Sequence, residues 1–168
     1  MLEATTGSLE MSKVFEGTSQ NYIKCNECNY ESLSNDKFQD ITVSLFNFHT
    51  KENINCLEKG LEQFLMPYIL DGNNKYKCPK CNKDTVANKG TKIISLPEVL
   101  MVQLERFTFD SNTGNRVKLY NVMRFPFYID MKLYIGKIIT ANDVRSYDAM
   151  YITETEPKKD ISDIIMTI

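Results

Sequence analysis

Four of the five cysteines in this chain form two Cys-x-x-Cys pairs. The first pair is Cys25 and Cys28, and the second is Cys78 and Cys81. Two cysteines separated by two residues can direct both thiolates at one metal ion, and two such turns complete the tetrahedral shell of structural zinc. The pattern therefore predicts one structural Zn²⁺ ion. Because the pairs lie far apart in the chain, we expect them at two tips of a larger sheet.

Two other interpretations of the cysteine pairs remain open from the sequence alone. Disulfides would suit a secreted protein, but the N-terminus lacks the basic, apolar and small-residue succession of a signal peptide. A thioredoxin-like redox site needs a βαβ setting, which neither pair has. Zinc is the favoured interpretation, and the cysteine usage indicates a reducing compartment, the cytosol or the nucleus.

The remaining cysteine, Cys56, lies near the start of a predicted helix, whose dipole could lower the pKa of its thiol. His49 is the single histidine of the chain, so any thiol–imidazole or serine–histidine mechanism within it must use this residue. A nucleophile also needs a base and an orienting group in fixed geometry. The sequence therefore favours a half-buried helix cysteine and a loop histidine over a catalytic dyad.

The composition predicts about one soluble domain. The chain has 168 residues, an apolar fraction of 42% and a net charge of −2, which suits a core and gives no general attraction to nucleic acid. No stretch approaches the roughly 18 apolar residues of a membrane span, so we expect no membrane partner.

Lysines gather around the second cysteine pair, which raises the alternative of a nucleic-acid-binding zinc ribbon. Few aromatic residues accompany them, and the first pair is acidic, so a solvated sheet face is favoured and nucleic acid is not an expected partner. The lysines concerned are Lys75, Lys77, Lys80, Lys83, Lys89 and Lys92.

The apolar periodicity predicts an α+β fold of mostly antiparallel strands with one helix. The helix is expected over 54–65, with Asn53 or Asn55 as its cap and Pro67 as its end. Residues 34–36 are rich in turn formers. Strands are expected on both sides of each cysteine pair and over 38–46, 91–95, 99–109 and 117–124.

Several short blocks accompany the two cysteine pairs in a fixed order along the chain. They are Phe15-x-Gly17, Tyr30-x-Ser32, Phe38-x-Asp40-Ile41, Leu70-Asp71-Gly72-x-Asn74-x-Tyr76, Ala87-x-Lys89-Gly90, Leu96-Pro97-x-Val99-Leu100-x-x-Gln103-Leu104-x-Arg106-Phe107, Lys118-Leu119-x-Asn121 and Phe125-Pro126. Taken in this order, the blocks resemble the fingers and palm of the ubiquitin-specific proteases, and most closely the branch that contains the herpesvirus-associated enzyme. The resemblance covers about residues 14–135.

This resemblance implies a portion of a papain-like cysteine protease that removes ubiquitin, with a zinc-ribbon-like tip on its fingers. In the family the fingers grip ubiquitin, and palm strands line the channel for the ubiquitin tail. Gln103, Phe107 and Phe109 match channel positions, although Phe107 could equally be an ordinary core residue. The resemblance thus implies ubiquitin, or a ubiquitinated protein, as the partner.

The resemblance leaves out the family's catalytic boxes. No cysteine box precedes the fingers in residues 1–13, and residues 135–168 contain no histidine. We therefore expect the given chain to bind ubiquitin without hydrolysing its conjugates, with 1–13 as a disordered lead-in and 136–168 as an insertion or C-terminal extension. A non-catalytic zinc-dependent interaction module, or a truncated pseudo-protease, is the alternative.

Overall fold

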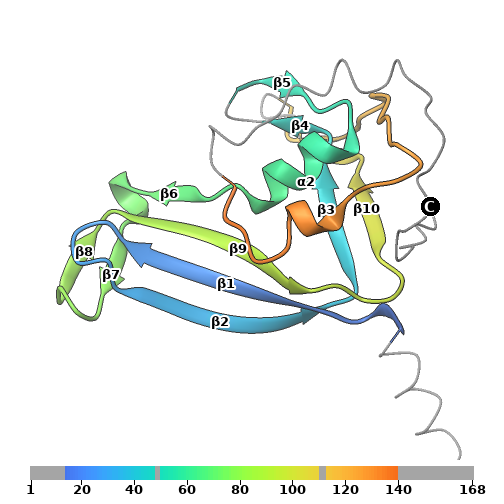
Figure 1. Ribbon diagram of the computed structural model, residues 1–168. Helices are drawn as coiled ribbons and strands as arrows, with labels where there is room; N and C mark the ends of the chain where they lie inside the picture. The colour runs from blue at the N-terminus through green and yellow to red at the C-terminus, as the bar shows by residue number, and fades with distance from the viewer. Residues whose placement is uncertain (1–13, 48–49, 110–112, 140–168) are drawn as a thin grey trace, which may run out of the picture.

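The computed structural model describes residues 14–47, 50–109 and 113–139 (Figure 1). The predicted lead-in, His49 and almost all of the predicted C-terminal extension lie outside these residues. Within them, one α-helix accompanies strands that pair antiparallel in every case but one, so the mostly antiparallel α+β fold is confirmed. No helix of the described residues is long and apolar enough to cross a membrane.

Four strands form the longest sheet of the molecule, which we call the long sheet. Its order is β2 (Glu31–Phe38), β1 (Gly17–Cys25), β9 (Ala87–Ser95) and β6 (Tyr68–Leu70), all antiparallel. The sheet extends away from the helix, and its far end carries the hairpin of β7 (Tyr76–Cys78) and β8 (Lys83–Thr85) (Figure 1). We call this far end, with both cysteine pairs, the tip.

Gly90 sits in the middle of β9 because a cross-strand tyrosine occupies the space above it. Tyr22 of β1 pairs with Gly90, and a Cβ atom added there would lie 2.7 Å from the Tyr22 hydroxyl oxygen. A glycine normally weakens a strand. Here its lack of a side chain lets a large aromatic ring lie buried across the sheet.

The other end of the molecule is a helix packed on a parallel pair of strands, and we call it the body. Strand β3 (Asp40–Ser44) pairs with β10 (Met101–Glu105) in parallel, and α2 (Leu57–Leu65) lies against β3 (Figure 1). These elements enclose the core, whose buried members are Ile41, Val43, Leu45, Ile54, Leu57, Leu61, Leu65, Ile93, Leu100, Met123, Met131, Tyr134 and Ile139.

The apolar face of α2 forms as the helical spacing predicts. Leu57, Leu61 and Leu65 are all buried against the core. Gly60, in the helix interior, faces Val43 so closely that an added Cβ would clash with its Cγ1. Glycine costs about 1 kcal/mol relative to alanine inside a helix, and here it allows the close approach of helix and strand.

Short elements complete the described residues. Two further hairpins and two 3₁₀ turns are present among the described residues. They are β4 (Phe46–Asn47) with β5 (Glu52–Asn53), β11 (Phe107–Phe109) with β12 (Arg116–Lys118), η1 (Gly72–Asn74) and η2 (Met131–Leu133).

The turn predicted over 34–36 is wrong, because these residues continue β2. Their polar side chains bond across the sheet. The Gln20 Nε2 donates to Asn35 Oδ1 at 2.9 Å, and the Asn21 Nδ2 donates to Asp36 Oδ2 at 2.6 Å. Cross-strand partners thus override the local turn preference of serine, asparagine and aspartate.

The helix begins later than predicted. It starts at Leu57 with Cys56 at the N-cap, where no side chain caps it, so neither Asn53 nor Asn55 has the predicted role. The Asn53 amide oxygen instead accepts a hydrogen bond from Asn121 Nδ2 at 2.8 Å. The Asn53 side chain therefore bonds to a residue distant in sequence and does not cap the helix.

The single strand predicted over 99–109 is divided at Arg106 into β10 and β11. The Arg106 N–H donates to the carbonyl of Leu104, only two residues earlier, at 2.9 Å, and this tight bond bends the chain. The return strand predicted over 117–124 is also shorter, since pairing with β11 extends only over Arg116–Lys118.

Candidate metal centre and exposed strand face

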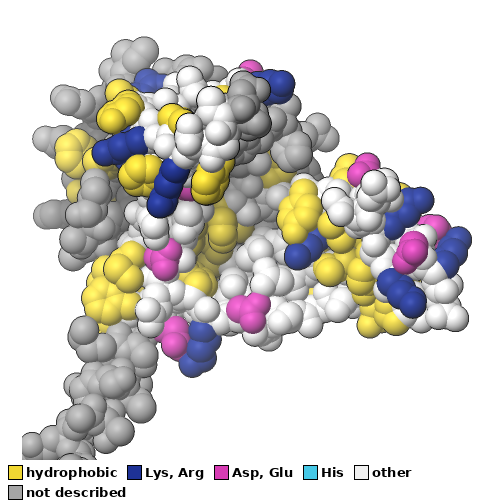
Figure 2. Space-filling model, turned by 180° about the vertical axis from the view of Figure 1, so that it is seen from behind, with side chains coloured by type: hydrophobic (Ala, Val, Ile, Leu, Met, Phe, Trp, Pro, Cys, Tyr) yellow, Lys and Arg dark blue, Asp and Glu magenta, His cyan; other side chains and the backbone are white. Residues whose placement is uncertain are grey.

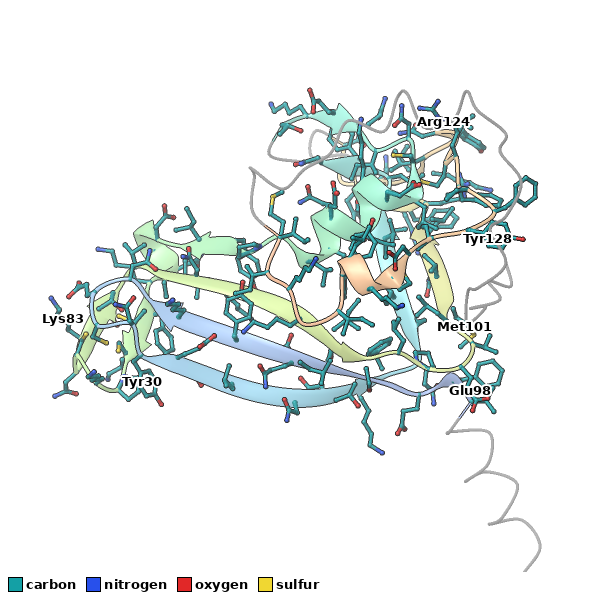
Figure 3. The ribbon with its side chains drawn as sticks, viewed as in Figure 1. Tyr30, Lys83, Glu98, Met101, Arg124 and Tyr128 are labelled. Atoms are coloured by element: carbon teal, nitrogen blue, oxygen red, sulfur yellow. The ribbon has the colours of Figure 1, made fainter. Side chains whose placement is uncertain are left out.

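The two cysteine pairs meet at the tip of the long sheet. The Sγ atoms of Cys25 and Cys81 are 3.9 Å apart, and those of Cys28 and Cys78 are 3.6 Å apart. All four sulfurs lie within 4.8 Å of one another. Figure 3 shows them between the labelled Tyr30 and Lys83.

These distances fit a metal ion and not disulfides. Bonds of about 2.3 Å to a tetrahedral Zn²⁺ place sulfurs roughly 3.8 Å apart, whereas a disulfide needs about 2.05 Å. None of the four cysteines of the cluster forms a disulfide. The four-cysteine cluster can therefore hold one ion, and its four sulfurs would fill a tetrahedral shell without an open position for substrate.

Each pair is shaped by the asparagine that follows it. The Asn29 N–H donates to the Cys25 carbonyl at 3.0 Å, and the Asn82 N–H donates to the Cys78 carbonyl at 2.8 Å. Both asparagines have positive φ, 57° and 55°, a conformation that asparagine tolerates better than most residues. The repeated Cys-x-x-Cys-Asn pattern was a sequence signal for this geometry, but the two asparagines were not identified from it.

A buried threonine supports the first pair. The Thr85 hydroxyl oxygen lies 3.3 Å from the Tyr76 carbonyl oxygen and 3.3 Å from the Cys25 Sγ, so its single proton can be donated to either of them. The contact with Thr85 is the main reason that the pKa of Cys25 falls to about 6. The hydrogen bond with Cys28 is the main reason that the pKa of Cys81 rises to about 12.

The opposite pKa shifts of Cys25 and Cys81 follow from hydrogen bonds to Thr85 and within the cluster, which favour a thiolate at Cys25 and a thiol at Cys81. The four sulfurs are too close for all of them to be thiolates unless a cation lies between them. A divalent metal supplies that charge and displaces the remaining protons. The chemistry of the donor set thus agrees with its geometry.

Two of the lysines near the second pair form contacts that join strands. Lys83 forms an ion pair with Glu27 at 2.8 Å, which raises the pKa of Lys83. Lys92 lies 3.5 Å from Glu31 and 4.9 Å from the centre of the Tyr22 ring. These contacts agree with the predicted solvated sheet face, in which basic side chains have acidic neighbours across the sheet.

The predicted ubiquitin-tail residues lie on exposed positions of β10 and β11. Gln103 is exposed, Phe107 is 47% exposed and Phe109 is 71% exposed, while Val102 and Leu104 are half-buried. Phe107 is therefore not an ordinary core residue. The exposed positions alternate along the chain, which leaves all three side chains available to a ligand.

Cys56 offers no accessible thiol, because it is buried at the N-cap of α2 beside Arg124. His49 lies outside the described residues. The sequence preference for a structural cysteine over a nucleophile agrees with this burial.

Comparison with known proteins places the chain in a family. The model of the ubiquitin carboxyl-terminal hydrolase family matches residues 3–159. A ubiquitin carboxyl-terminal hydrolase 47 of Drosophila melanogaster is 37% identical over 127 residues, covering 76% of this chain and 8% of its own length. The Homo sapiens protein of the same name is 35% identical over 125 residues, covering 74% and 9%.

A more distant relative, ubiquitin carboxyl-terminal hydrolase 25 of Arabidopsis thaliana, is 33% identical over 105 residues, covering 62% of this chain and 15% of its own length. The chain thus spans less than a tenth of the first two relatives. The family match covers most of the chain and both cysteine pairs. The chain belongs to the ubiquitin carboxyl-terminal hydrolase family.

Proposed function

We propose that residues 14–135 are the fingers and part of the palm of a ubiquitin-specific protease, of the branch that contains the herpesvirus-associated enzyme. The intact parent protein hydrolyses the bond after the C-terminus of ubiquitin with a catalytic cysteine. The observation that carries this proposal is the family match over residues 3–159. The long sheet with its four-cysteine tip supports the assignment to fingers.

In this proposal the chain itself contributes binding and not chemistry. Cys56 is buried and the other four cysteines form the cluster, which supports a nucleophile outside residues 14–135; the family resemblance implies that the catalytic histidine lies outside them as well. The long sheet contacts the globular body of ubiquitin without forming a covalent bond. A reducing compartment, the cytosol or nucleus, is part of the same proposal, because free thiols persist there.

The metal in this proposal is one structural Zn²⁺ held by Cys25, Cys28, Cys78 and Cys81. The sulfur separations and the mixed pKa shifts support it. When bound, the ion would cross-link the turn between β1 and β2 to the β7–β8 hairpin. It would thereby hold the tip in one shape for ubiquitin.

The tail of ubiquitin is proposed to lie along Gln103, Phe107 and Phe109. Their exposure supports this position, because large apolar side chains at 47% and 71% exposure offer area to a ligand. An extended tail matches an extended strand, whose exposed side chains repeat at every second residue.

The experiment is an NMR titration of the zinc-loaded chain into isotopically labelled ubiquitin, repeated with ubiquitin that lacks its C-terminal tail. We expect shifts on one face of ubiquitin in both titrations, and additional shifts in the tail of the intact protein. The Phe109→Ala variant should lose the tail shifts and keep the others. Val122→Ala is the matched control, since it truncates another exposed side chain. Absence of shifts at high concentration of both partners would contradict the proposed function.

A further inference from the structure

The β11–β12 hairpin presents basic and aromatic side chains on one face. Phe107 pairs with Lys118 and Phe109 pairs with Arg116, and all four are exposed. Paired residues of an antiparallel hairpin share a face. Together with Tyr120, which follows β12 and is 80% exposed, these residues form what we call the aromatic–basic face.

The cations of this face lie against rings. The Arg116 guanidinium is 4.6 Å from the centre of the Phe107 ring, and the Lys118 ammonium is 5.4 Å from that of Tyr120. Figure 2 shows hydrophobic and basic side chains interleaved on the body. A guanidinium stacked on a ring is held in place while its edge donors still point outward, which suits a carboxylate.

The positive charge of the face is not neutralised by a described carboxylate. Lys37, Lys83 and Lys92 each form an ion pair with a glutamate. Within the described ranges, Arg116 and Lys118 form ring contacts and no ion pair. Their charges are therefore available to a ligand of opposite sign.

The backbone of β12 is available as well. In the part of the chain that the structure describes, β12 pairs only with β11, so its other edge presents unpaired N–H and C=O groups. An extended peptide can add to such an edge as a new strand. Its alternate side chains would then lie beside Arg116 and Lys118, which are two residues apart on the same face.

We propose that the aromatic–basic face binds an extended acidic peptide that adds as a strand along β12. Carboxylates at every second residue of the peptide pair with Arg116 and Lys118. A protein strand fits this site better than a nucleic acid, because the open edge offers main-chain hydrogen bonds and Arg116 already covers one side of the Phe107 ring on which a base would stack. This binding does not depend on ubiquitin, although Phe107 and Phe109 are shared with the proposed tail site.

The test measures fluorescence anisotropy of a labelled peptide in which glutamate and threonine alternate. A second peptide of the same composition carries its glutamates in adjacent positions. We expect the alternating peptide to bind more tightly, and we expect the double variant Arg116→Gln/Lys118→Gln to weaken it by roughly fivefold, since each opposite-charge pair across strands contributes a few tenths to 1 kcal/mol.

The matched control is Lys132→Gln/Lys137→Gln, which removes two exposed positive charges elsewhere on the body. It should leave binding of the alternating peptide unchanged. An equal loss of peptide affinity in the control variant would show that binding depends only on the net charge of the protein. Equal affinity for the two peptides would exclude strand addition. A single-stranded thymidine oligonucleotide that displaces the peptide, and that the Arg116 and Lys118 substitutions also weaken, would overturn the proposal in favour of nucleic acid.

Unchanged circular dichroism of each variant shows that the fold is intact. A separate titration with ubiquitin keeps the two proposals apart, because peptide binding without ubiquitin binding supports this site alone. No binding of the alternating peptide at low salt, where charge pairs are strongest, would contradict the proposal directly.

Discussion

The long sheet and the body differ in how their strands are paired and in how much apolar side-chain surface they expose. In the long sheet, β1 is paired on both sides, and polar side chains bond across it. The tip is closed by turns of defined geometry around the four-cysteine cluster. Some large apolar side chains of the long sheet are nevertheless exposed, among them Leu33 at 53% and Ile69 at 61%.

The body leaves more large apolar side chains exposed than the long sheet does. Its parallel sheet has only two strands in the described part of the chain, although parallel sheets are normally covered on both faces. The segment after β12 exposes several large side chains, among them Val122 at 75% and Phe127 at 98%. Figure 3 shows Arg124 and Tyr128 of this segment on the body, far from the tip.

The difference indicates where each region draws its stability. The long sheet depends on contacts within itself and, in the proposed function, on a metal at its tip, whereas the body depends on the tight packing of α2 and leaves apolar surface exposed. Removing the metal should therefore destabilise the tip alone, whereas a disruptive substitution in α2 should destabilise the whole fold.

Removing the metal has the largest expected effect. Binding of structural zinc contributes roughly 10–16 kcal/mol in small zinc domains, and that energy is folding energy. Cys78→Ser, or a chelator, should abolish binding of the ion and abolish amide protection in β7 and β8, while α2 stays protected. Hydrogen exchange followed by mass spectrometry measures both regions, and metal content is measured in parallel.

The control for this prediction is Cys56→Ala, which removes a thiol outside the cluster and should retain the metal. Full protection of the tip after complete chelation would show that the cysteine cluster does not need an ion.

Gly60→Ala should destabilise the body by about 1–3 kcal/mol. The helix gains propensity from alanine, but the new Cβ clashes with Val43, and overpacking of this kind outweighs the gain. Chemical denaturation measures the free energy of unfolding. The double variant Gly60→Ala/Val43→Ala should lose less free energy of unfolding than the two single variants lose together, because the smaller side chain at position 43 relieves the clash. Additive effects would show that the two residues do not touch.

Asn21→Ala should cost about 1–2 kcal/mol of local stability in the long sheet. Its Oδ1 accepts from Thr91 Oγ1 at 2.6 Å and its Nδ2 donates to Asp36 Oδ2 at 2.6 Å, so one residue links three strands. Gln20→Ala, which breaks one exposed bond to Asn35, should cost less. Equal hydrogen-exchange protection in both variants would refute the linking role of Asn21.

Tyr22→Phe has the smallest expected effect, between zero and about 1 kcal/mol of stabilisation. The buried Tyr22 hydroxyl has no hydrogen-bond partner among the described residues, so its removal loses no bond. Burial raises the pKa of Tyr22, so the folded state keeps the proton more tightly than the unfolded chain does. The stability that the folded state gains by keeping the Tyr22 hydroxyl protonated is fully present below pH about 10 and is lost as the pH rises further.

Stability measured against pH checks this prediction, since the phenylalanine variant should show a smaller alkaline decline than the wild type. A loss above 1 kcal/mol at neutral pH would reveal a partner for the hydroxyl.

Features set by neighbouring residues were predictable from the sequence. The two Cys-x-x-Cys pairs come together as their spacing predicts, and α2 buries the leucines that recur at helical intervals. The helix ends at Leu65, before Pro67, as expected. The helix depends on a few consecutive residues, and the cysteine pairs were predictable because two Cys-x-x-Cys turns together supply the four ligands that structural zinc needs, even though the pairs lie far apart in the chain.

Features set by distant partners were not predictable in the same way. Residues 34–36 form a strand because of β1, and Asn53 fails as a cap because of Asn121. The parallel pairing of β3 with β10 joins segments about sixty residues apart, and no local pattern reports it. The ubiquitin-tail positions came from family resemblance, and their exposure followed only from the fold.

The central claim is that an ion at the tip gives the long sheet the shape that contacts ubiquitin. The most direct test is one titration of the chain into labelled ubiquitin, first zinc-loaded, then after chelation, and then after zinc is restored. We predict shifts on the globular body of ubiquitin that disappear with the metal and return with it. Identical shifts before and after chelation would contradict the claim.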